Sequence, residues 1–299
     1  MHPAAALPTL TGMGATFLLS RGVVAVSGED AVVFLQGLVT NDVHKLVEGQ
    51  AQYAALLSPQ GKFLHDFFLV LTAGKILMDC DQSRMDDLIK RLALYKLRAK
   101  VTIEVLPENM EICAFWDMKD RLSIRHAICV GDPRVAAMGY RAIGDRATLR
   151  EWCSEHGHML AEEEAYHTHR IALGVPQGGV DLLPEKSFLL EWGVDQLHGV
   201  DYQKGCYVGQ EVTARTHYRG QVKKAPYKLT ADAILPASAT VYCGEAEVGE
   251  MRSSAGHTGL ALLRMEQVAQ AKTSGMPLRV GDIIVEATLP PWYAPAATS

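Results

Sequence analysis

The spacing of apolar residues along the first part of the chain predicts strands and helices in alternation. Residues 21–28 form an apolar run that ends at a glycine, and a helix is expected through the following "AVVFLQGL". Residues 51–80 divide at Ser-Pro-Gln-Gly and Ala-Gly-Lys into three apolar runs, which is typical of a β-meander. In residues 81–100 the apolar side chains recur at helical spacing. The pattern as a whole indicates an α+β fold.

The pattern changes close to Pro226. Before it, we expect strands at 100–106, 110–116 and 126–131, and helices at 147–157 and 161–174. After it, short β-rich runs alternate with Gly, Pro and Ala-Ser breaks, as in a small antiparallel barrel or sandwich. We therefore predict a domain boundary near residues 222–227.

Composition places few restrictions on the function. The 299 residues are 48% hydrophobic and carry a formal net charge of −5, so a large core is expected and a general affinity for nucleic acid is not. No apolar run approaches the roughly 20 residues that cross a bilayer. The N-terminal stretch lacks the arginine-rich, acid-poor character of a transit peptide. These features predict a cytoplasmic protein with no membrane partner.

The six cysteines are dispersed and include no C-x-x-C pair. This spacing argues against a zinc knuckle, a thioredoxin-type site or a self-contained iron–sulfur ligand set. We therefore expect reduced thiols and no permanently bound metal.

Cys206 differs from the other five because it lies between two glycines and close to Lys204, in "KGCYVGQE". The residues from Gly209 predict a short helix with Glu211 in its first turn. The positive N-terminal end of this helix and the Lys204 ammonium would both favour the reactive thiolate form of Cys206. The alternative is a small residue that fills a tight corner of the chain, and residue types alone leave both interpretations open.

The same region carries a local positive charge. Residues 204–228 contain six Lys or Arg residues and one acid, a charge of +5 in a chain of −5. Such a segment can dock an anionic ligand, such as a carboxylate-rich cofactor tail, a phosphate or RNA, or it can be a solvated connector between domains.

At this point the sequence resembles a known family. Residues 204–211 are similar to the K-G-C-Y-x-G-Q-E signature of the YgfZ family of folate-binding proteins, and the following "TARTHYRG" resembles its Iba57-like branch. Four further blocks occur in the same order: "SRGVVAVSGEDAVVFLQGLVTNDV", "YAALLSPQGKFLHDFFL", "RIALGVPQGG" and "GEMRSSAGHTGLALLR". The wider superfamily includes the aminomethyltransferase of the glycine cleavage system.

The resemblance implies an aminomethyltransferase-like, folate-binding domain of two α+β lobes over residues 1–222 and a β-barrel domain over 223–299. It also implies tetrahydrofolate or a derivative as cofactor, and a role in the assembly or repair of iron–sulfur clusters in client proteins, including tRNA-modifying enzymes. Cys206 and Lys204 are the signature pair, with a transient cluster contact at Cys206. Folate-binding positions implied by the motifs are Tyr166, Asp66, Lys204, Gly205, Tyr207, Gln210 and Glu211.

One departure from the superfamily affects the expected chemistry. His65 aligns with an aspartate that hydrogen-bonds the pterin in aminomethyltransferases, and an imidazole has at most one acceptor nitrogen for the paired N–H groups of that ring. Asp66 is retained beside it. We therefore predict an accessory factor for iron–sulfur proteins, not a conventional enzyme. The alternatives are a folate-dependent aminomethyl or methyl transferase and an RNA-binding module.

Overall fold

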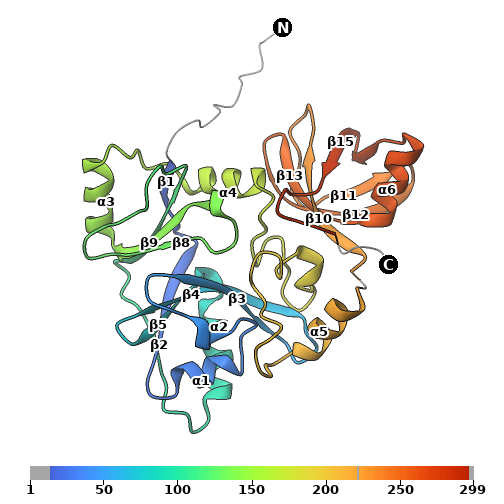
Figure 1. Cartoon of the computed structure of the whole chain (residues 1–299). Helices are drawn as coiled ribbons and strands as arrows, with labels where there is room; N and C mark the ends of the chain where they lie inside the picture. Colours follow the sequence, from blue (N-terminus) through green and yellow to red (C-terminus); the bar gives the residue numbers. More distant parts are fainter. Residues whose placement is uncertain (1–13, 221, 296–299) are drawn as a thin grey trace.

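The computed structural model describes residues 14–220 and 222–295, which form two α+β lobes, an intervening loop region and a C-terminal barrel (Figure 1). The first lobe is an antiparallel sheet in the order β3-β4-β5-β2-β6, with α1 and α2 on one face. Its elements are β2 (Arg21–Ser27), α1 (Ala31–Gln36), β3 (Ala51–Leu57), β4 (Phe63–Thr72), β5 (Lys75–Asp81), α2 (Met85–Lys96) and β6 (Thr102–Val105), with short 3₁₀ turns at Val43–Lys45 and Gln82–Arg84. The predicted meander, first helix and helix over 81–100 are confirmed.

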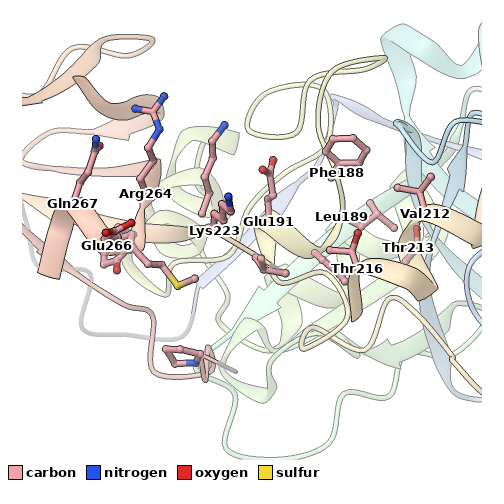
Figure 2. Close-up of a pocket in the computed structure, with 16 residues that line it drawn as sticks. Phe188, Leu189, Glu191, Val212, Thr213, Thr216, Lys223, Arg264, Glu266 and Gln267 are labelled. Atoms are coloured by element: carbon pink, nitrogen blue, oxygen red, sulfur yellow. The ribbon is translucent and has the colours of Figure 1, made fainter. Parts of the chain in front are cut away.

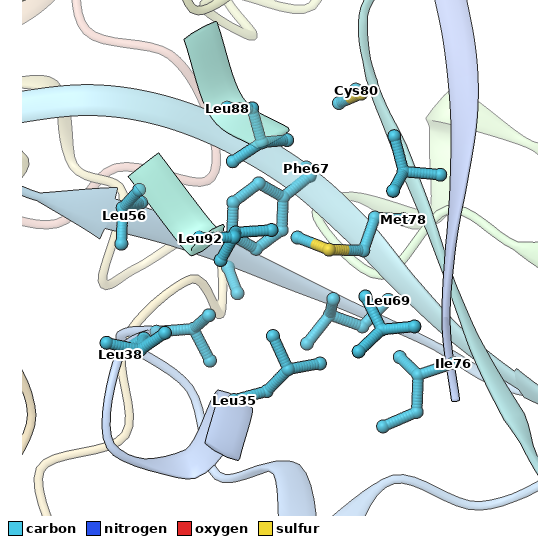
Figure 3. Packing of buried hydrophobic residues seen from close by; sticks show 14 of the residues in the cluster. Leu35, Leu38, Leu56, Phe67, Leu69, Ile76, Met78, Cys80, Leu88 and Leu92 are labelled. Atoms are coloured by element: carbon cyan, nitrogen blue, oxygen red, sulfur yellow. The ribbon is translucent and has the colours of Figure 1, made fainter. Parts of the chain in front are cut away.

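Strand β4 is central to this lobe because both of its faces are buried. Phe67 and Leu69 pack with Met78 of β5 and with Leu88 and Leu92 of α2 in the apolar layer shown in Figure 3. On the other face, alternate residues face the second lobe and the loop region. Burial on both faces accounts for the almost unbroken apolar run in this part of the sequence.

The second lobe is a four-stranded antiparallel sheet in the order β1-β7-β9-β8. Its elements are β1 (Gly14–Phe17), β7 (Met110–Trp116), β8 (Ile128–Gly131), a 3₁₀ turn (Ala136–Met138), β9 (Tyr140–Asp145), α3 (Arg146–Glu155) and α4 (Glu163–Ala172). Both helices and the strands at 110–116 and 126–131 match the prediction. The sequence pattern missed β1 and β9, which are short, and β9 is interrupted by the polar Arg141 and by Gly144.

The barrel closes in the strand order β10-β13-β12-β11-β14-β15. Its elements are β10 (Lys224–Thr230), β11 (Thr240–Cys243), β12 (Ala246–Ala255), β13 (Thr258–Arg264), α6 (Met265–Ser274), β14 (Leu278–Val280) and β15 (Ile283–Thr288). The predicted fold class is confirmed, but α6 was missed because only Val268 and Ala271 of its ten residues are buried. The division into two domains remains a prediction.

Between the lobes and the barrel lie a 3₁₀ turn at Leu190–Trp192 and α5 (Gln210–Arg219). Asp181 joins this region to both neighbours, because its carboxylate accepts hydrogen bonds from Arg170 of α4 at 2.8 Å and from Ser253 of the barrel at 2.6 Å. Among the helices of the described ranges, none combines the length and apolar composition that a bilayer crossing requires.

Candidate functional site

Cys206 is the exposed thiol of this chain. All six cysteines lie in the described residues; three are buried and two are half-buried, leaving Cys206 as the exposed one. Its loop is nevertheless fixed on both sides, because Lys204 and Tyr207 are buried. The structure therefore supports the interpretation of Cys206 as an accessible group and not as a residue that fills a core corner.

Lys204 anchors the loop to the end of α1. Its ammonium donates hydrogen bonds to the backbone carbonyls of Gln36 at 2.8 Å, Val39 at 2.5 Å and Asn41 at 2.8 Å. Burial lowers the pKa of Lys204 to about 8, against the opposing effect of Asp42 and Asp201, so the group is mainly protonated at neutral pH. A cation is favourable at a helix C-terminus.

This geometry gives Lys204 a different role from the predicted one. All three N–H groups of its ammonium are used by carbonyls of a neighbouring segment, so none is left to bind a folate tail or the Cys206 thiolate. Lys204 holds the loop in place, and its partners lie more than 160 residues away in the sequence.

Gly209 fixes the other side of the loop. Its φ is +81°, and a Cβ at this position would lie 2.4 Å from the carbonyl oxygen of Ser58. The helix α5 begins at the next residue, as predicted, but Cys206 precedes its first residue by four positions. Helix-end electrostatics fall off within the first turn, so the expected activation of Cys206 by α5 is not supported.

The other predicted residues of the signature do not form a pocket around Cys206. The side chain of Glu211 is exposed and pairs with Arg215 at 3.0 Å. Gly205 is exposed with open space beside it, and Gln210 is half-buried at the start of α5. Tyr207 is buried in the apolar cluster below the loop, together with Leu57 and Leu190.

Tyr166 and Asp66, the two predicted folate contacts outside the signature, do lie together between the lobes. Tyr166 accepts hydrogen bonds from Arg141 at 2.7 Å and Arg134 at 3.0 Å, and Asp66 accepts one from Tyr53 at 2.9 Å. These two predicted residues therefore share one site, whereas their hydrogen-bond partners were not expected.

That site is filled by a cluster of buried arginines and aspartates, which we call the interlobe cluster. Asp79 pairs with Arg21 at 2.6 Å and with Arg141 at 2.7 Å, and Asp132 pairs with Arg134 at 2.7 Å. Burial disfavours the ionised carboxylate, but the two arginines beside it hold the pKa of Asp132 below its usual value. The members of the interlobe cluster are Arg21, Arg134, Arg141, Asp66, Asp79 and Asp132, three cations and three acids.

A pterin does not fit this arrangement. The remaining cavity has a volume of about 10 Å³, which is the space of one water molecule. The face of Phe68 is already covered by the guanidinium of Arg141, at 3.9 Å from the ring centroid. Displacing these groups would leave buried charges without partners, which is costly.

His65 lies on the opposite face of β4 from this site. Its Nε2 is 2.8 Å from Asp87 of α2, and burial lowers the pKa of the imidazole. Alternate residues of a strand face opposite sides, so Asp66 and Phe68 face the interlobe cluster while His65 does not. His65 therefore faces α2, and the carboxylate on the side of the site is Asp66, one of the predicted folate contacts. The alignment of His65 with the aminomethyltransferase aspartate stays a prediction.

The predicted basic patch is dispersed. Lys204 is buried, Arg215 pairs with Glu211, and Lys228 reaches the backbone carbonyl of Ala172 at 3.5 Å. What remains is a smaller group of cations between the end of α5 and the start of the barrel, at Arg219, Lys223 and Lys224. Within the described residues, no three His, Cys, Asp or Glu side chains are placed to hold a metal ion.

Comparison with known proteins gives consistent matches. Residues 223–295 match the family described as the CAF17 C-terminal beta-barrel domain. The chain is 33% identical to the mitochondrial iron-sulfur cluster assembly factor IBA57 of Homo sapiens over 321 residues, covering 96% of this chain and 87% of the human protein. The corresponding protein of Mus musculus is 33% identical over 93% of this chain and 84% of its own length.

A solved structure supports the fold. Glycine cleavage system aminomethyltransferase T from Bartonella henselae superposes with a TM-score of 0.77 over 94% of this chain and 86% of its own, at 14% sequence identity. At this identity the likeness concerns the fold alone.

These relatives correct the predicted location. The IBA57 relatives are mitochondrial proteins, which points away from the cytoplasmic location expected from the sequence. The expectation depended on the composition of the N-terminal stretch, and residues 1–13 lie outside the described part of the chain.

The Iba57-like resemblance is thus confirmed over nearly the whole chain. The chain belongs to the IBA57 family of iron–sulfur cluster assembly factors.

Proposed function

We propose that the chain serves the assembly or repair of iron–sulfur clusters in other proteins, and that Cys206 is the group that contacts a cluster or a cluster-bearing partner. The observation that carries this proposal is the exposed Cys206 thiol on a loop fixed by Lys204 and Gly209. The names of the relatives, which are iron–sulfur cluster assembly factors, support the role in cluster assembly.

A single thiol is suited to a passing contact. Iron–sulfur clusters are usually held by four cysteine thiolates. No other cysteine of the chain is exposed, so a cluster that Cys206 ligates must take its remaining ligands from a partner. A rigid loop presents the thiol without a large ordering cost, while the shared cluster can leave with the partner. Client proteins that modify tRNA remain a prediction from the resemblance.

Loss of the gene tests this function. A strain without it is expected to lose most of the activity of enzymes that need a [4Fe–4S] cluster, with haem and flavin enzymes unchanged. A plasmid copy should restore that activity. Full iron–sulfur enzyme activity in the deletion strain, under conditions that demand cluster repair, would contradict the proposal.

Tetrahydrofolate is not part of the proposed mechanism, although the resemblance predicts it. The charge-balanced interlobe cluster occupies the position between Tyr166 and Asp66, and we infer that the chain works without a pterin there. Titration of the purified protein with tetrahydrofolate is expected to give no saturable heat change up to about 1 mM, which means a binding free energy weaker than about 4 kcal/mol.

An aminomethyltransferase of the glycine cleavage system, titrated in the same buffer, is the positive control. Saturable binding by the present chain at micromolar tetrahydrofolate would overturn the inference. The transferase alternative is not proposed, because the interlobe cluster leaves a cavity of only about 10 Å³ beside Asp66. The RNA-binding alternative is not proposed, because Lys204 is buried and Arg215 and Lys228 have partners within the chain.

A further inference from the structure

A wide groove separates the barrel from α5 (Figure 2). Its volume is about 1160 Å³, and its walls come from the barrel, from α5 and from the loop before Leu190. Arg264, Glu266 and Gln267 lie on the barrel side, while Phe188 and Val212 lie on the other. We call this space the α5 groove.

The α5 groove exposes apolar surface. Phe188, Val212, Val222 and Met265 line it and are only half-buried. Apolar side chains that converge on an open space between two structural units are typical of a binding surface. Within the described residues, no segment of the chain fills it.

Positive charge lies along the rim of the groove. Lys223, Lys224 and Arg264 line it together with Glu191 and Glu266, and none of these five forms an ion pair with another described residue. The local balance is positive in a chain whose net charge is −5.

The groove is connected to Cys206 through α5. Val212, Thr213 and Thr216 form its α5 wall, and of the ten residues of this helix only Thr213 is buried. Val212 follows Cys206 by six positions, and the helix itself is about 15 Å long. A segment that fills the groove would contact α5, the helix that directly follows the Cys206 loop.

We propose that the α5 groove is the docking site of the partner that meets Cys206. The occupant is a segment of a partner protein that places apolar side chains between Val212 and Met265 and presents Asp or Glu residues to Lys223, Lys224 and Arg264. This inference rests on the proposed function and adds to it the chemistry of the partner.

The test reverses the rim charge in the full-length protein, produced in the deletion strain. The variant Lys223→Glu/Lys224→Glu is expected to restore at least tenfold less iron–sulfur enzyme activity than wild type. The matched control is Lys75→Glu/Lys119→Glu, which makes the same charge change at two exposed positions outside the groove and should restore activity fully. Titration of exposed thiols should give the same single reactive cysteine in all three proteins.

Second-site suppressor mutations of the charge-reversed variant would identify the partner protein and the charge of its docking segment. We expect them to change Asp or Glu to Lys or Arg in one other protein. If the groove variant restores as much iron–sulfur enzyme activity as the control variant, the docking proposal is overturned. If Cys206→Ala still fails to restore that activity in the same strain, the proposed function stands. A wild-type dimer that becomes a monomer in the variant, or a small molecule bound only to wild type in native mass spectrometry, would assign the groove to another occupant.

Discussion

Replacing Asp79 by asparagine is expected to lower the free energy of unfolding by about 3–5 kcal/mol. Asp79 is 1% exposed and accepts hydrogen bonds from Arg21 at 2.6 Å and Arg141 at 2.7 Å. The substitution keeps the shape of the side chain but leaves the interlobe cluster with one more cation than acids. Because Asp79 lies on β5 of the first lobe and Arg141 on β9 of the second, the loss should also weaken the contact between the lobes.

Urea denaturation of wild type and Asp79→Asn measures this effect. The exposed Asp120 supplies the matched control, because Asp120→Asn removes the same charge from the surface and should change stability by less than about 0.5 kcal/mol. If Asp79→Asn costs no more than Asp120→Asn, the cluster does not join the lobes and the pocket between them can open.

The elements that could be predicted from the sequence are those with a strong local signal. The apolar runs of β3, β4 and β5 are separated by turn residues, and α2 has apolar side chains at helical spacing. The meander and the helix were therefore both expected. Helix α6 was not, since its burial involves two positions only. The spacing of apolar residues thus predicts a helix or strand when one of its faces is extensively buried. It fails when the element forms mainly because of contacts with distant parts of the chain.

The interlobe cluster could not be predicted in this way. The two ion pairs of Asp79 join residues 58 and 62 positions apart, at Arg21–Asp79 and Arg141–Asp79, and no sequence spacing relates them. By contrast, the pair Arg134–Asp132 is local in the sequence. The available signal was a charged side chain inside an apolar strand, as at Asp79 and Arg141, since charged residues are almost never fully buried unless paired.

The positions of His65 and Asp66 show a second limit. A β-bulge shifts the register at the start of β4, where Leu56 opposes His65 and Leu57 opposes Phe63. One extra residue in a strand changes which side chain faces the core. Of the two neighbouring residues that the motifs singled out on this strand, Asp66 faces the pocket and His65 faces α2.

The signature around Cys206 was the most informative part of the sequence for function. It predicted an unusual thiol, and the structure adds that this thiol is exposed on a fixed loop. The role of Lys204 could not be predicted, because its carbonyl partners lie more than 160 residues away, at the end of α1 and in the segment after it.

Replacing Cys206 by alanine is expected to remove the function while preserving the fold. The side chain is exposed, so the free energy of unfolding should change by less than about 0.5 kcal/mol. The methyl side chain of alanine cannot bind iron as a thiolate does. The variant should therefore restore less than a tenth of the wild-type activity of a [4Fe–4S] enzyme in the deletion strain. Cys243→Ala, at a half-buried position of the barrel, is the matched control and should restore activity as wild type does.

The direct test of the account is therefore the specific activity of one [4Fe–4S] enzyme, measured in the deletion strain with equal amounts of wild type, Cys206→Ala and Cys243→Ala. The account predicts near-background activity with Cys206→Ala and full activity with the other two. Equal activity with all three proteins would contradict the claim that this exposed thiol carries the function.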